Sequence, residues 1–276
     1  MNNILIIIPA RFASTRLPAK PLMKICGKEM IVRVAEIADF VCKKTENCSY
    51  IVATDNDKIE SFCDKNKIPV LITSEDCKSG TERCWNAVEK RNEKPDFIIN
   101  LQGDNPLCPP WFLENLIESW SKDKNLSPLQ VFTPYLHLSW EDYDRFIESK
   151  KTTPFSGTSV IFDKNNNALA FSKAVIPNIR NEAKLRQTLD KSPICRHIGL
   201  YAYTYTALKA YFEIEHSPYE EPEGLEQMRF LHNNIPIKMI KVDYKGRKSM
   251  SGIDSPEDIV RAENIIKEYG EFILTI

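Results

Sequence analysis

The loop that follows the first apolar stretch of the chain holds residues suited to binding phosphate groups. Its cations are Arg11, Arg16 and Lys20, and its prolines are Pro9, Pro18 and Pro21. Arginine offers a planar fork of donors and lysine a compact charge, so a loop stiffened by proline suits a triphosphate. Ser14 and Thr15 add hydroxyl groups. No glycine precedes Gly27, which excludes the backbone cradle of a Walker motif, and composition alone also allows a solvated basic loop.

Two aspartates far apart in the sequence are candidate magnesium ligands. Asp104 follows an apolar stretch at Gly103, where a flexible residue lets the chain turn and expose the carboxylate. Asp254 precedes Ser255 and the N-capping sequence that opens the last expected helix. Magnesium takes one or two protein carboxylates and completes its shell with phosphate oxygens and water. We therefore predict that Asp104 and Asp254 share the ion, and a capping or turn role is the alternative for Asp254.

Two further groups of polar residues are candidate substrate contacts. Gly80 and Thr81 stand just before a helical pattern, where free N–H groups can bind negative charge or the acceptor atoms of a pyrimidine. Thr81 could instead serve only as an N-cap. Arg196 and His197 lie in a strand-like segment and could bind a carboxylate or hydroxyl groups, although a lone histidine is more often structural.

The elements that must position these residues alternate between strand and helix in the first 121 residues, which is typical of βαβ units around a parallel sheet. Strands are expected at 4–8, 50–54, 70–72 and 97–101, and helices at 30–42, 58–66 and 80–90. Further along, strands are expected at 129–138, 159–162, 168–171 and 237–242, a hairpin turn at 164–167, and helices at 222–232 and 255–269. The predicted fold class is α/β, a Rossmann-like doubly wound, mostly parallel sheet with an inserted β-rich dimerisation sub-domain.

The chain is interpreted as a single domain that spans residues 1–276, because no internal repeat or low-complexity tract divides it. Residues 1–125 and 195–276 are assigned to the core, and residues from about 126 to 194 to the inserted sub-domain. The polar and charged stretch 177–192 is interpreted as a mobile loop.

Charge and cysteine content restrict the class of partner. Lys and Arg total 37 against 38 Asp and Glu, without a run of five like charges, so neither a nucleic-acid groove nor a polybasic membrane anchor is indicated. No apolar stretch approaches the roughly 20 residues needed to cross a bilayer, and residues 4–8 lack the flanks of a signal peptide. The eight cysteines include no C-x-x-C pair, which argues against a disulfide framework or a zinc site. We expect a cytoplasmic protein with a small-molecule partner, no nucleic acid and no membrane insertion.

Seven blocks, in order along almost the whole chain, resemble the sugar-acid cytidylyltransferases, and within them the type that uses 3-deoxy-manno-octulosonate (KDO). The blocks are PARFASTRLPAKPL (9–22), IVATD (51–55), SGTER (79–83), NLQGDNP (100–106), RHIGLY (196–201), LEQMR (225–229) and GIDSPED (252–258). Any one block alone is weak, whereas all of them in register make the resemblance specific.

The resemblance implies transfer of CMP from CTP to the anomeric hydroxyl of a 3-deoxy-2-keto sugar acid, with KDO as acceptor, magnesium as cofactor and pyrophosphate as product. It further implies a nucleotidyltransferase that acts as a homodimer in bacterial surface polysaccharide synthesis. The implied catalytic residues are Arg11, Arg16, Lys20, Asp104 and Asp254, the last two as metal ligands. The implied substrate contacts are Ser14, Ser79, Gly80, Thr81, Arg83, Gln102, Arg196, His197, Tyr201, Glu226 and Gln227. Without the resemblance, Glu226 and Gln227 would be an ordinary surface pair in the middle of a helix.

The sequence also departs from the family pattern. Asn105 stands where the KDO enzymes usually have glutamate, and Ser159 stands where a lysine is expected. The polar stretch 178–191 and the basic residues 245–248 also differ, and the latter are interpreted as compensating charge. The same chemistry on 8-amino-KDO, a nonulosonic acid or a phosphonate analogue is therefore an open alternative.

A non-catalytic nucleotide-binding protein is the alternative from a different functional class, since a fold alone does not establish activity. Such a protein would have little reason to keep Lys20, Asp104 and Asp254 together. Guanylyl- and uridylyltransferases are less favoured because they prefer a glycine-rich first loop.

Overall fold

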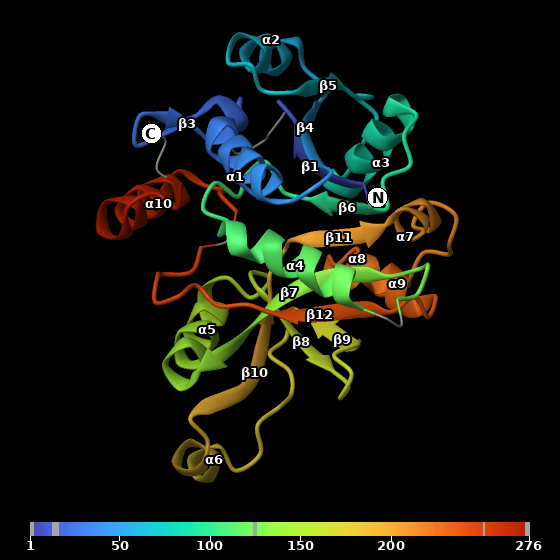
Figure 1. Cartoon of the computed structure of the whole chain (residues 1–276). Coiled ribbons are helices and arrows are strands. Elements are labelled where there is room, and N and C mark those ends of the chain that lie inside the picture. The colour runs from blue at the N-terminus through green and yellow to red at the C-terminus, as the bar shows by residue number, and fades with distance from the viewer. Residues whose placement is uncertain (1–2, 13–16, 124–125, 251, 274–276) are drawn as a thin grey trace.

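The computed structural model describes residues 3–12, 17–123, 126–250 and 252–273. Within these residues, ten strands form one sheet in the order β5-β4-β1-β6-β11-β7-β10-β8-β9, with β12 paired to β7 (Figure 1). The strands of this sheet are β1 Ile4–Ala10, β4 Cys48–Thr54, β5 Val70–Ile72, β6 Phe97–Asn100, β7 Val131–Ser139, β8 Thr158–Phe162, β9 Ala168–Ser172, β10 Lys191–His197, β11 Tyr201–Thr204 and β12 Ile237–Lys241. A separate small hairpin consists of β2 Lys24–Ile25 and β3 Lys28–Glu29.

Strand β1 lies in the parallel half of the sheet, between β4 and β6. All seven of its residues are buried, as a central parallel strand covered on both faces requires. Ile4, Ile6 and Ile8 face one hydrophobic core, whereas Leu5 and Ile7 face another. Successive side chains of a strand point to opposite faces of the sheet, so β1 lies between the two cores and contributes side chains to both.

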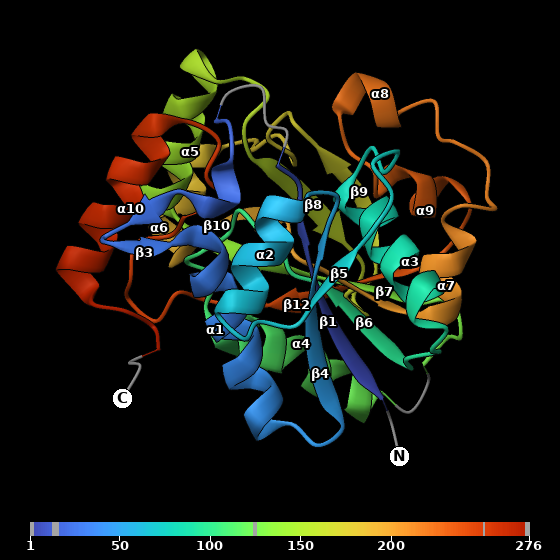
Figure 2. The same cartoon turned by 90° about the horizontal axis from the view of Figure 1, so that it is seen from above.

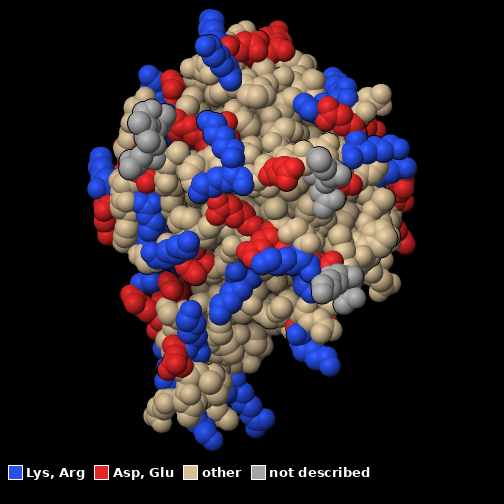
Figure 3. Space-filling model, in the orientation of Figure 1, with Lys and Arg blue, Asp and Glu red and all other residues tan. Residues whose placement is uncertain are grey.

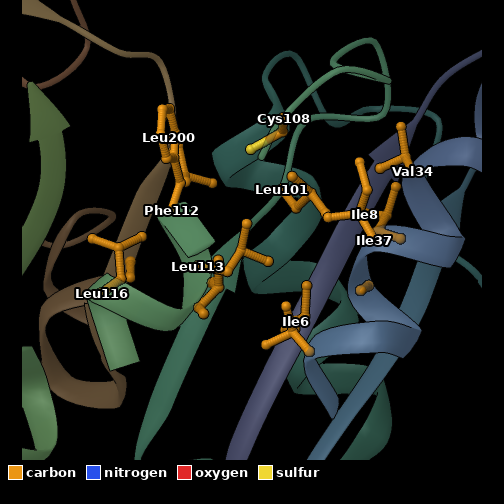
Figure 4. Close-up of a cluster of buried hydrophobic side chains, with 14 of the residues drawn as sticks. Ile6, Ile8, Val34, Ile37, Leu101, Cys108, Phe112, Leu113, Leu116 and Leu200 are labelled. Carbon is orange, nitrogen blue, oxygen red and sulfur yellow. The ribbon is translucent and has the colours of Figure 1, made fainter. Parts of the chain in front are cut away.

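Helices cover both faces of this half of the sheet (Figures 1 and 2). On one face, α1 Met30–Lys44, α2 Asp57–Lys65 and α4 Pro110–Lys122 contribute to the first core. Figure 4 shows part of it, where Ile6 and Ile8 of β1 lie near Val34 and Ile37 of α1 and Leu113 of α4. The other face packs against α3 Gly80–Arg91, α7 Tyr205–Ala210 and α9 Met228–His232.

The second half of the sheet is antiparallel, except that β12 runs parallel to β7. Helix α5 Trp140–Thr152 packs against β7 and β10 through Tyr143, Phe146 and Ile194. Helix α6 Glu182–Thr188 lies at the end of an arm that extends away from the rest of the molecule (Figure 1). The arm returns into the sheet through β10.

The C-terminal helix α10 Pro256–Tyr269 packs against the small hairpin in a core of its own that includes Ile25, Met30 and Ile266. Beyond the helix, Glu271 forms an ion pair with the buried Arg33 of α1. These contacts fix the C-terminal part of the chain beside the loop that follows β1.

The α/β fold class predicted from the sequence is confirmed. The strand expected at 70–72 matches β5, and the helix expected at 255–269 differs from α10 by a single residue at its start. The division into a core and an inserted sub-domain, and the dimerisation role of the latter, stay predictions. Strands β7 to β10 from this segment continue the same sheet. Among the described residues, no helix is long and apolar enough to span a membrane.

Two expectations about secondary structure were wrong. The helix expected at 222–232 is broken into α8 Glu220–Glu223 and α9, because Gly224 takes a left-handed conformation with φ of 60° that ends α8. The stretch 177–192, interpreted as a loop, contains α6 and the start of β10. Helix α6 has no buried residue, so no apolar periodicity marks it in the sequence.

Candidate active site

A cavity of about 250 Å³ opens at the carboxyl ends of β1 and β6, where open α/β sheets bind ligands. Its described lining residues are Pro9, Ala10, Arg11, Lys20, Pro21, Cys77, Lys78, Ser79, Gly80, Arg83, Gln102, Gly103, Asp104 and Asp254. Charges of both signs are interspersed over the face shown in Figure 3, without a large field of either sign. Residues from both ends of the chain therefore meet at one site of the size and polarity that suits a small charged ligand.

The ammonium group of Lys20 lies between the two predicted metal ligands. It donates to Asp104 Oδ2 at 2.8 Å, to the carbonyl of Ile253 at 2.8 Å and to Asp254 Oδ1 at 3.3 Å. Because Asp104 Oδ2 and Asp254 Oδ1 both contact Lys20 Nζ, the distance between these two oxygens cannot exceed the sum of their distances to the nitrogen. The Lys20 side chain is 14% exposed, Asp104 32% and Asp254 58%, so the carboxylates stay open to a ligand.

Two local features place Asp104 and Asp254 together. The backbone of Gly103 passes so close to β1 that a Cβ there would lie 2.7 Å from the carbonyl oxygen of Pro9. The Ile253 N–H donates to the carbonyl of Asp104 at 2.8 Å, which ties the segment before α10 to the end of β6. Ser255 is the N-cap of α10, in a capping box with Asp258. The side chain of Asp254 is therefore not the cap and turns toward Lys20 instead.

The donor set fits a magnesium ion. Among the described residues, no three His, Cys, Asp or Glu side chains cluster as a metal site. A magnesium ion needs fewer, because it commonly takes one or two carboxylates and obtains its other ligands from substrate phosphate and water. Asp104 and Asp254 already share one cation, the ammonium of Lys20, and their oxygens are the hard ligands that magnesium prefers.

The amino-terminal end of α3 forms another wall of the cavity. Ser79 is the N-cap, since its hydroxyl accepts a hydrogen bond from the N–H of Glu82 at 3.1 Å. The suggested capping role of Thr81 is thus filled by Ser79. Gly80 lies beside the side chain of Gln102, and both residues line the cavity. The start of α3 therefore borders the space where a ligand would sit, and free N–H groups at a helix start can bind acceptor atoms.

Arg83 is a largely buried part of this wall and is held by a network at the ends of β4 and β5. It donates to Asp55 Oδ2 and to Thr73 Oγ1, both at 2.6 Å. Asp55 also accepts from the backbone N–H of Phe12 at 3.4 Å, so one carboxylate connects α3 with the loop after β1. The carboxylate that pairs with Arg83 is thus that of Asp55, distant in the sequence, and not that of its neighbour Glu82.

Arg11 and Lys78 add positive charge to the rim of the cavity. Within the described part of the chain, the side chain of Arg11 has no acidic partner. Lys78 was missed in the sequence, although it directly precedes the block at 79–83. The predicted residues Ser14 and Arg16 lie outside the described residues.

A chain of hydrogen bonds leads from the cavity to a second polar cluster. Gln102 donates to Asn100 Oδ1 at 2.9 Å, Asn100 contacts Thr81 Oγ1 at 3.5 Å, and Thr81 donates to Glu226 Oε1 at 2.8 Å. Burial raises the pKa of the Glu226 carboxyl above its ordinary value. Gln227 is 1% exposed, and its Nε2 has no partner among the described residues. Glu226 and Gln227 lie in the turn between α8 and α9 rather than in the middle of a helix.

His197 and Tyr201 continue this polar face at the ends of β10 and β11. Both are buried, with their ring centroids 5.4 Å apart. His197 Nε2 lies 2.7 Å from Thr133 Oγ1. Arg196 points to the other face of the sheet, because neighbouring residues on a strand alternate, and its guanidinium lies over the ring of Phe146. The structure thus separates Arg196 from the face that carries His197.

The sheet register shows how far the cavity lies from the second polar cluster, which consists of His197, Tyr201, Glu226 and Gln227. Ala202 of β11 pairs with both Ile99 and Phe132, so Tyr135 of β7 lies level with the position of Gln102. His197 pairs with Tyr135 and therefore falls on the same row. At roughly 4.8 Å per strand, three strand spacings place His197 about 14 Å from the end of β6. A substrate bound along this edge could contact both clusters.

The departures from the family pattern have distinct surroundings. Ser159 is buried and donates to the carbonyl of Ala174 at 2.6 Å, so it fastens β8 to the segment after β9. Asn105 is also buried, and its Oδ1 has no partner among the described residues. The basic residues 245–248 do not line the cavity, because Lys245 packs over Trp111 and Arg247 over Phe272.

Comparison with known proteins identifies relatives across nearly the whole chain. A family model described as cytidylyltransferase matches residues 5–241. The 3-deoxy-manno-octulosonate cytidylyltransferase of Maricaulis maris is 40% identical over 272 residues, which cover 98% of this chain and 100% of the relative. The mitochondrial enzyme of the same name from Arabidopsis thaliana is 32% identical over 97% of this chain and 84% of its own length.

Solved structures give the same picture. The CMP:2-keto-3-deoxy-manno-octonic acid synthetase complexed with CTP superposes with a TM-score of 0.81 at 30% identity, over 97% of this chain and 99% of the other. A cytidylyltransferase from Leptospira borgpetersenii, at 18% identity, covers 100% of this chain and 99% of its own with a TM-score of 0.57 and shares the fold.

Proposed function

The chain belongs to the 3-deoxy-manno-octulosonate cytidylyltransferase family, and we propose that it transfers CMP from CTP to the anomeric hydroxyl of KDO and releases pyrophosphate. The observation that carries this proposal is the position of Lys20 Nζ between Asp104 and Asp254 on the wall of the cavity. Nucleotidyl transfer from a triphosphate needs carboxylates that can hold a metal ion and a cation that offsets phosphate charge, and these three side chains supply both at one place. The names of the relatives and the CTP complex of the similar structure support the same reaction.

In the proposed reaction, the anomeric hydroxyl of the sugar acid releases its proton to solvent, and its oxygen forms a bond to the α-phosphorus of CTP. The bond between this phosphorus and the oxygen that bridges to the β-phosphorus breaks, and pyrophosphate leaves with the electron pair. Such transfers depend on position and charge neutralisation more than on covalent chemistry. Arg11 and Lys20 offset phosphate charge from the described part of the loop, and Arg16 is proposed to join them.

Magnesium is the proposed cofactor, with Asp104 and Asp254 as its protein ligands. When bound, the ion would neutralise triphosphate charge and orient the phosphates. Lys20 lies on the same carboxylates, so its ammonium holds them close together before substrate binds. This role in preparing the site is distinct from its contact with phosphate.

The cytosine and ribose are proposed to bind beside the amino-terminal end of α3. Ser79, Gly80 and Gln102 line the cavity there, and backbone N–H groups at a helix start suit the acceptor atoms of a pyrimidine. Arg83 lines the cavity as well, but its bonds to Asp55 and Thr73 fix the wall. We therefore assign the specificity for CTP mainly to the backbone and side chains of the helix start.

The sugar acid is proposed to bind between the cavity and the second polar cluster. His197, Tyr201, Glu226 and Gln227 form that cluster on one face of the sheet. Ser159 pairs with Arg196 and so faces away from this cluster, and its uncharged hydroxyl is engaged with backbone groups, so the position supplies no positive charge there. For this reason 8-amino-KDO, a nonulosonic acid and a phosphonate analogue remain alternative acceptors.

A homodimer in the cytoplasm that supplies bacterial surface polysaccharide synthesis completes the proposal. The dimer rests on the family resemblance and the cytoplasmic location on the composition of the chain. Light scattering of the purified protein tests the dimer, since a monomer mass at micromolar concentration would contradict it.

The direct test of the function is pyrophosphate release, measured with each of four NTPs and a panel of sugar acids. We expect turnover with CTP and KDO, and much less with ATP, GTP or UTP. Equal turnover with ATP would contradict the assigned nucleotide. Release with a nonulosonic acid and not with KDO would transfer the proposal to the alternative acceptor. No release with any acceptor, despite CTP binding, would support the non-catalytic alternative.

A further inference from the structure

A buried hydrogen-bond group beneath the second polar cluster determines which nitrogen of His197 carries a proton. Thr133 is fully buried in β7. Its hydroxyl oxygen lies 2.7 Å from His197 Nε2, 2.8 Å from the carbonyl oxygen of Leu200 and 3.2 Å from that of Ile198. None of these residues except His197 was assigned a role from the sequence.

The number of protons available decides the direction of each bond. Two oxygen atoms 2.8 Å apart need a proton between them, and a carbonyl has none, so Thr133 donates to Leu200. A hydroxyl group has one proton, and it is used in that bond. The short contact with Nε2 therefore needs a proton on His197, which donates to the oxygen of Thr133.

The surroundings of the ring keep it neutral. Phe171 lies edge-on at 5.1 Å between centroids, and Tyr201 packs beside the ring. Burial, together with a smaller effect of the positive charge of Lys173, lowers the pKa of His197 to about 3. A neutral imidazole protonated at Nε2 leaves Nδ1 as an acceptor. Among the described residues, Nδ1 has no hydrogen-bond partner.

We propose that Thr133 is a positioning residue that fixes His197 in the neutral Nε2–H form, so that Nδ1 accepts a hydrogen bond from a hydroxyl group of the sugar acid. The identity of the ligand rests on the function proposed above, whereas the protonation state does not. A carboxylate carries no proton and is repelled by the lone pair of Nδ1. In this proposal His197 recognises the polyol part of the substrate. The sequence left open whether His197 binds a carboxylate or a hydroxyl group, and the protonation state favours a hydroxyl group.

The protonation state is tested by nitrogen NMR of the histidine side chains in the intact protein at pH 7. Replacement of His197 by Gln assigns its signals. His137 is an internal reference, because its Nε2 lies 2.8 Å from the carbonyl of Ser192 and must also be protonated. We expect His197 to show a protonated Nε2, as His137 does, and an unprotonated Nδ1. A protonated Nδ1, in either a neutral or a charged ring, would overturn the proposal.

The positioning role is tested with Thr133→Val, which keeps the shape of the side chain and removes the hydroxyl, and with Thr133→Ser, which retains the hydroxyl. We expect the valine variant to gain the Nδ1–H form and to raise KM for the sugar acid about tenfold, with KM for CTP unchanged. Serine should restore both the NMR pattern and the KM. An unchanged KM in Thr133→Val, in a variant shown to be folded, would overturn the recognition role.

The two proposals fail in different ways. If the wild-type protein releases no pyrophosphate with any sugar acid, the proposed function fails while the NMR pattern still tests the protonation state. The recognition role is then tested by titration of KDO alone. A change in the Nδ1 signal of His197 supports recognition, and an unchanged signal at saturating KDO overturns it.

Discussion

Lys20 is the residue whose charge the site uses most directly. It donates to two carboxylates and a backbone carbonyl, and its side chain is only 14% exposed. Lys20→Ala would remove a positive charge that offsets the triphosphate and would leave Asp104 and Asp254 to repel each other. We expect kcat/KM for CTP to fall by an amount equivalent to about 2–4 kcal/mol of transition-state stabilisation.

Steady-state kinetics with varied CTP measure this effect, and Lys24→Ala is the matched control. Lys24 lies four residues further along the chain, is largely exposed and pairs only loosely with Glu29 at 3.6 Å. It should leave kcat/KM unchanged. A Lys20→Ala variant within threefold of the wild type would remove this residue from the site.

His197 also makes the stability of the fold depend on pH. Its pKa of about 3 in the folded protein is below the ordinary value of 6.5, so the unfolded chain binds more protons between these values. The stability from the neutral ring is fully present above pH 6.5 and is lost as the pH falls toward 3. Relative to His197→Gln, the wild type should lose about 2 kcal/mol of unfolding free energy between pH 6.5 and about pH 5.

Urea unfolding at a series of pH values measures this difference. His232→Gln, a change at an exposed histidine of α9, should run parallel to the wild type. If the unfolding free energies of the wild type and His197→Gln changed with pH in the same way, the fold would not hold the ring of His197 neutral.

At the scale of single elements, the ion pair between the buried Arg83 and the partly buried Asp55 joins α3 to the end of β4. Arg83→Met keeps much of the side-chain volume but leaves the carboxylate of Asp55, which is 15% exposed, without its partner. We expect a loss of about 3–5 kcal/mol in unfolding free energy, and a smaller loss when Asp55→Leu is added, because the unpaired charge is then removed. Arg91→Met, which breaks an exposed pair with Glu93 at the other end of α3, should change stability by less than about 0.5 kcal/mol.

Chemical denaturation measures the unfolding free energy of the wild type, Arg83→Met, Arg83→Met with Asp55→Leu, and Arg91→Met. A cost for Arg83→Met no larger than that for Arg91→Met would show that the pair does not hold the wall of the cavity. An equal or larger cost after addition of Asp55→Leu would contradict the unpaired charge as the cause.

The turn at the end of β6 depends on the absence of a side chain at Gly103. A Cβ in Gly103→Ala would lie 2.7 Å from the carbonyl oxygen of Pro9, so the two loops would have to separate and Asp104 would move. We expect turnover to fall about 100-fold, since a misplacement of about 1 Å in an active site can have this effect. Gly199→Ala is the control, because no atom lies within 4 Å of the added Cβ. Equal turnover in both variants would contradict this account.

The elements with strong local signals were predictable from the sequence. The apolar stretch of β1 and the capping residues before α10 identify their elements because burial and capping are local patterns. Helix α6 was missed because its residues show no apolar periodicity. The break at Gly224 was missed as well, because no apolar pattern marks it. The helix at 222–232 was expected because its composition favours helix on both sides of the glycine.

The candidate site was predictable where one residue type implies one kind of chemistry. Asp104, Asp254 and Lys20 were predicted as a group, and the structure brings them together. The pairing of Arg83 with Asp55, the role of Ser79 as the cap and the contact of Thr133 with His197 were not foreseen. The contacts of Arg83 and Thr133 depend on which strands lie side by side, and that order is a property of the folded sheet rather than of any local sequence. The cap at Ser79 is local, and the glutamate three residues later, Glu82, is the signal that could have identified it.

At the scale of the whole molecule, the site exists only because the fold unites the two ends of the chain. Asp104 ends a strand in the first half, whereas Asp254 precedes α10, and the bond from Ile253 to Asp104 joins the two segments. In either single variant, Asp104→Asn or Asp254→Asn, one carboxylate still faces Lys20. We therefore expect thermal stability to be nearly unchanged or raised in both variants.

The most direct measurement is turnover with CTP and KDO against magnesium concentration for the wild type, Asp104→Asn, Asp254→Asn and the double variant. Asp144→Asn, which alters an exposed pair with Arg186 far from the cavity, is the control and should behave as the wild type. Each single variant should lose at least about 100-fold in turnover, and the double variant should be little worse, because the two ligands act as a unit. Rates like those of the wild type in either single variant, at any magnesium concentration, would contradict the account of the shared metal site.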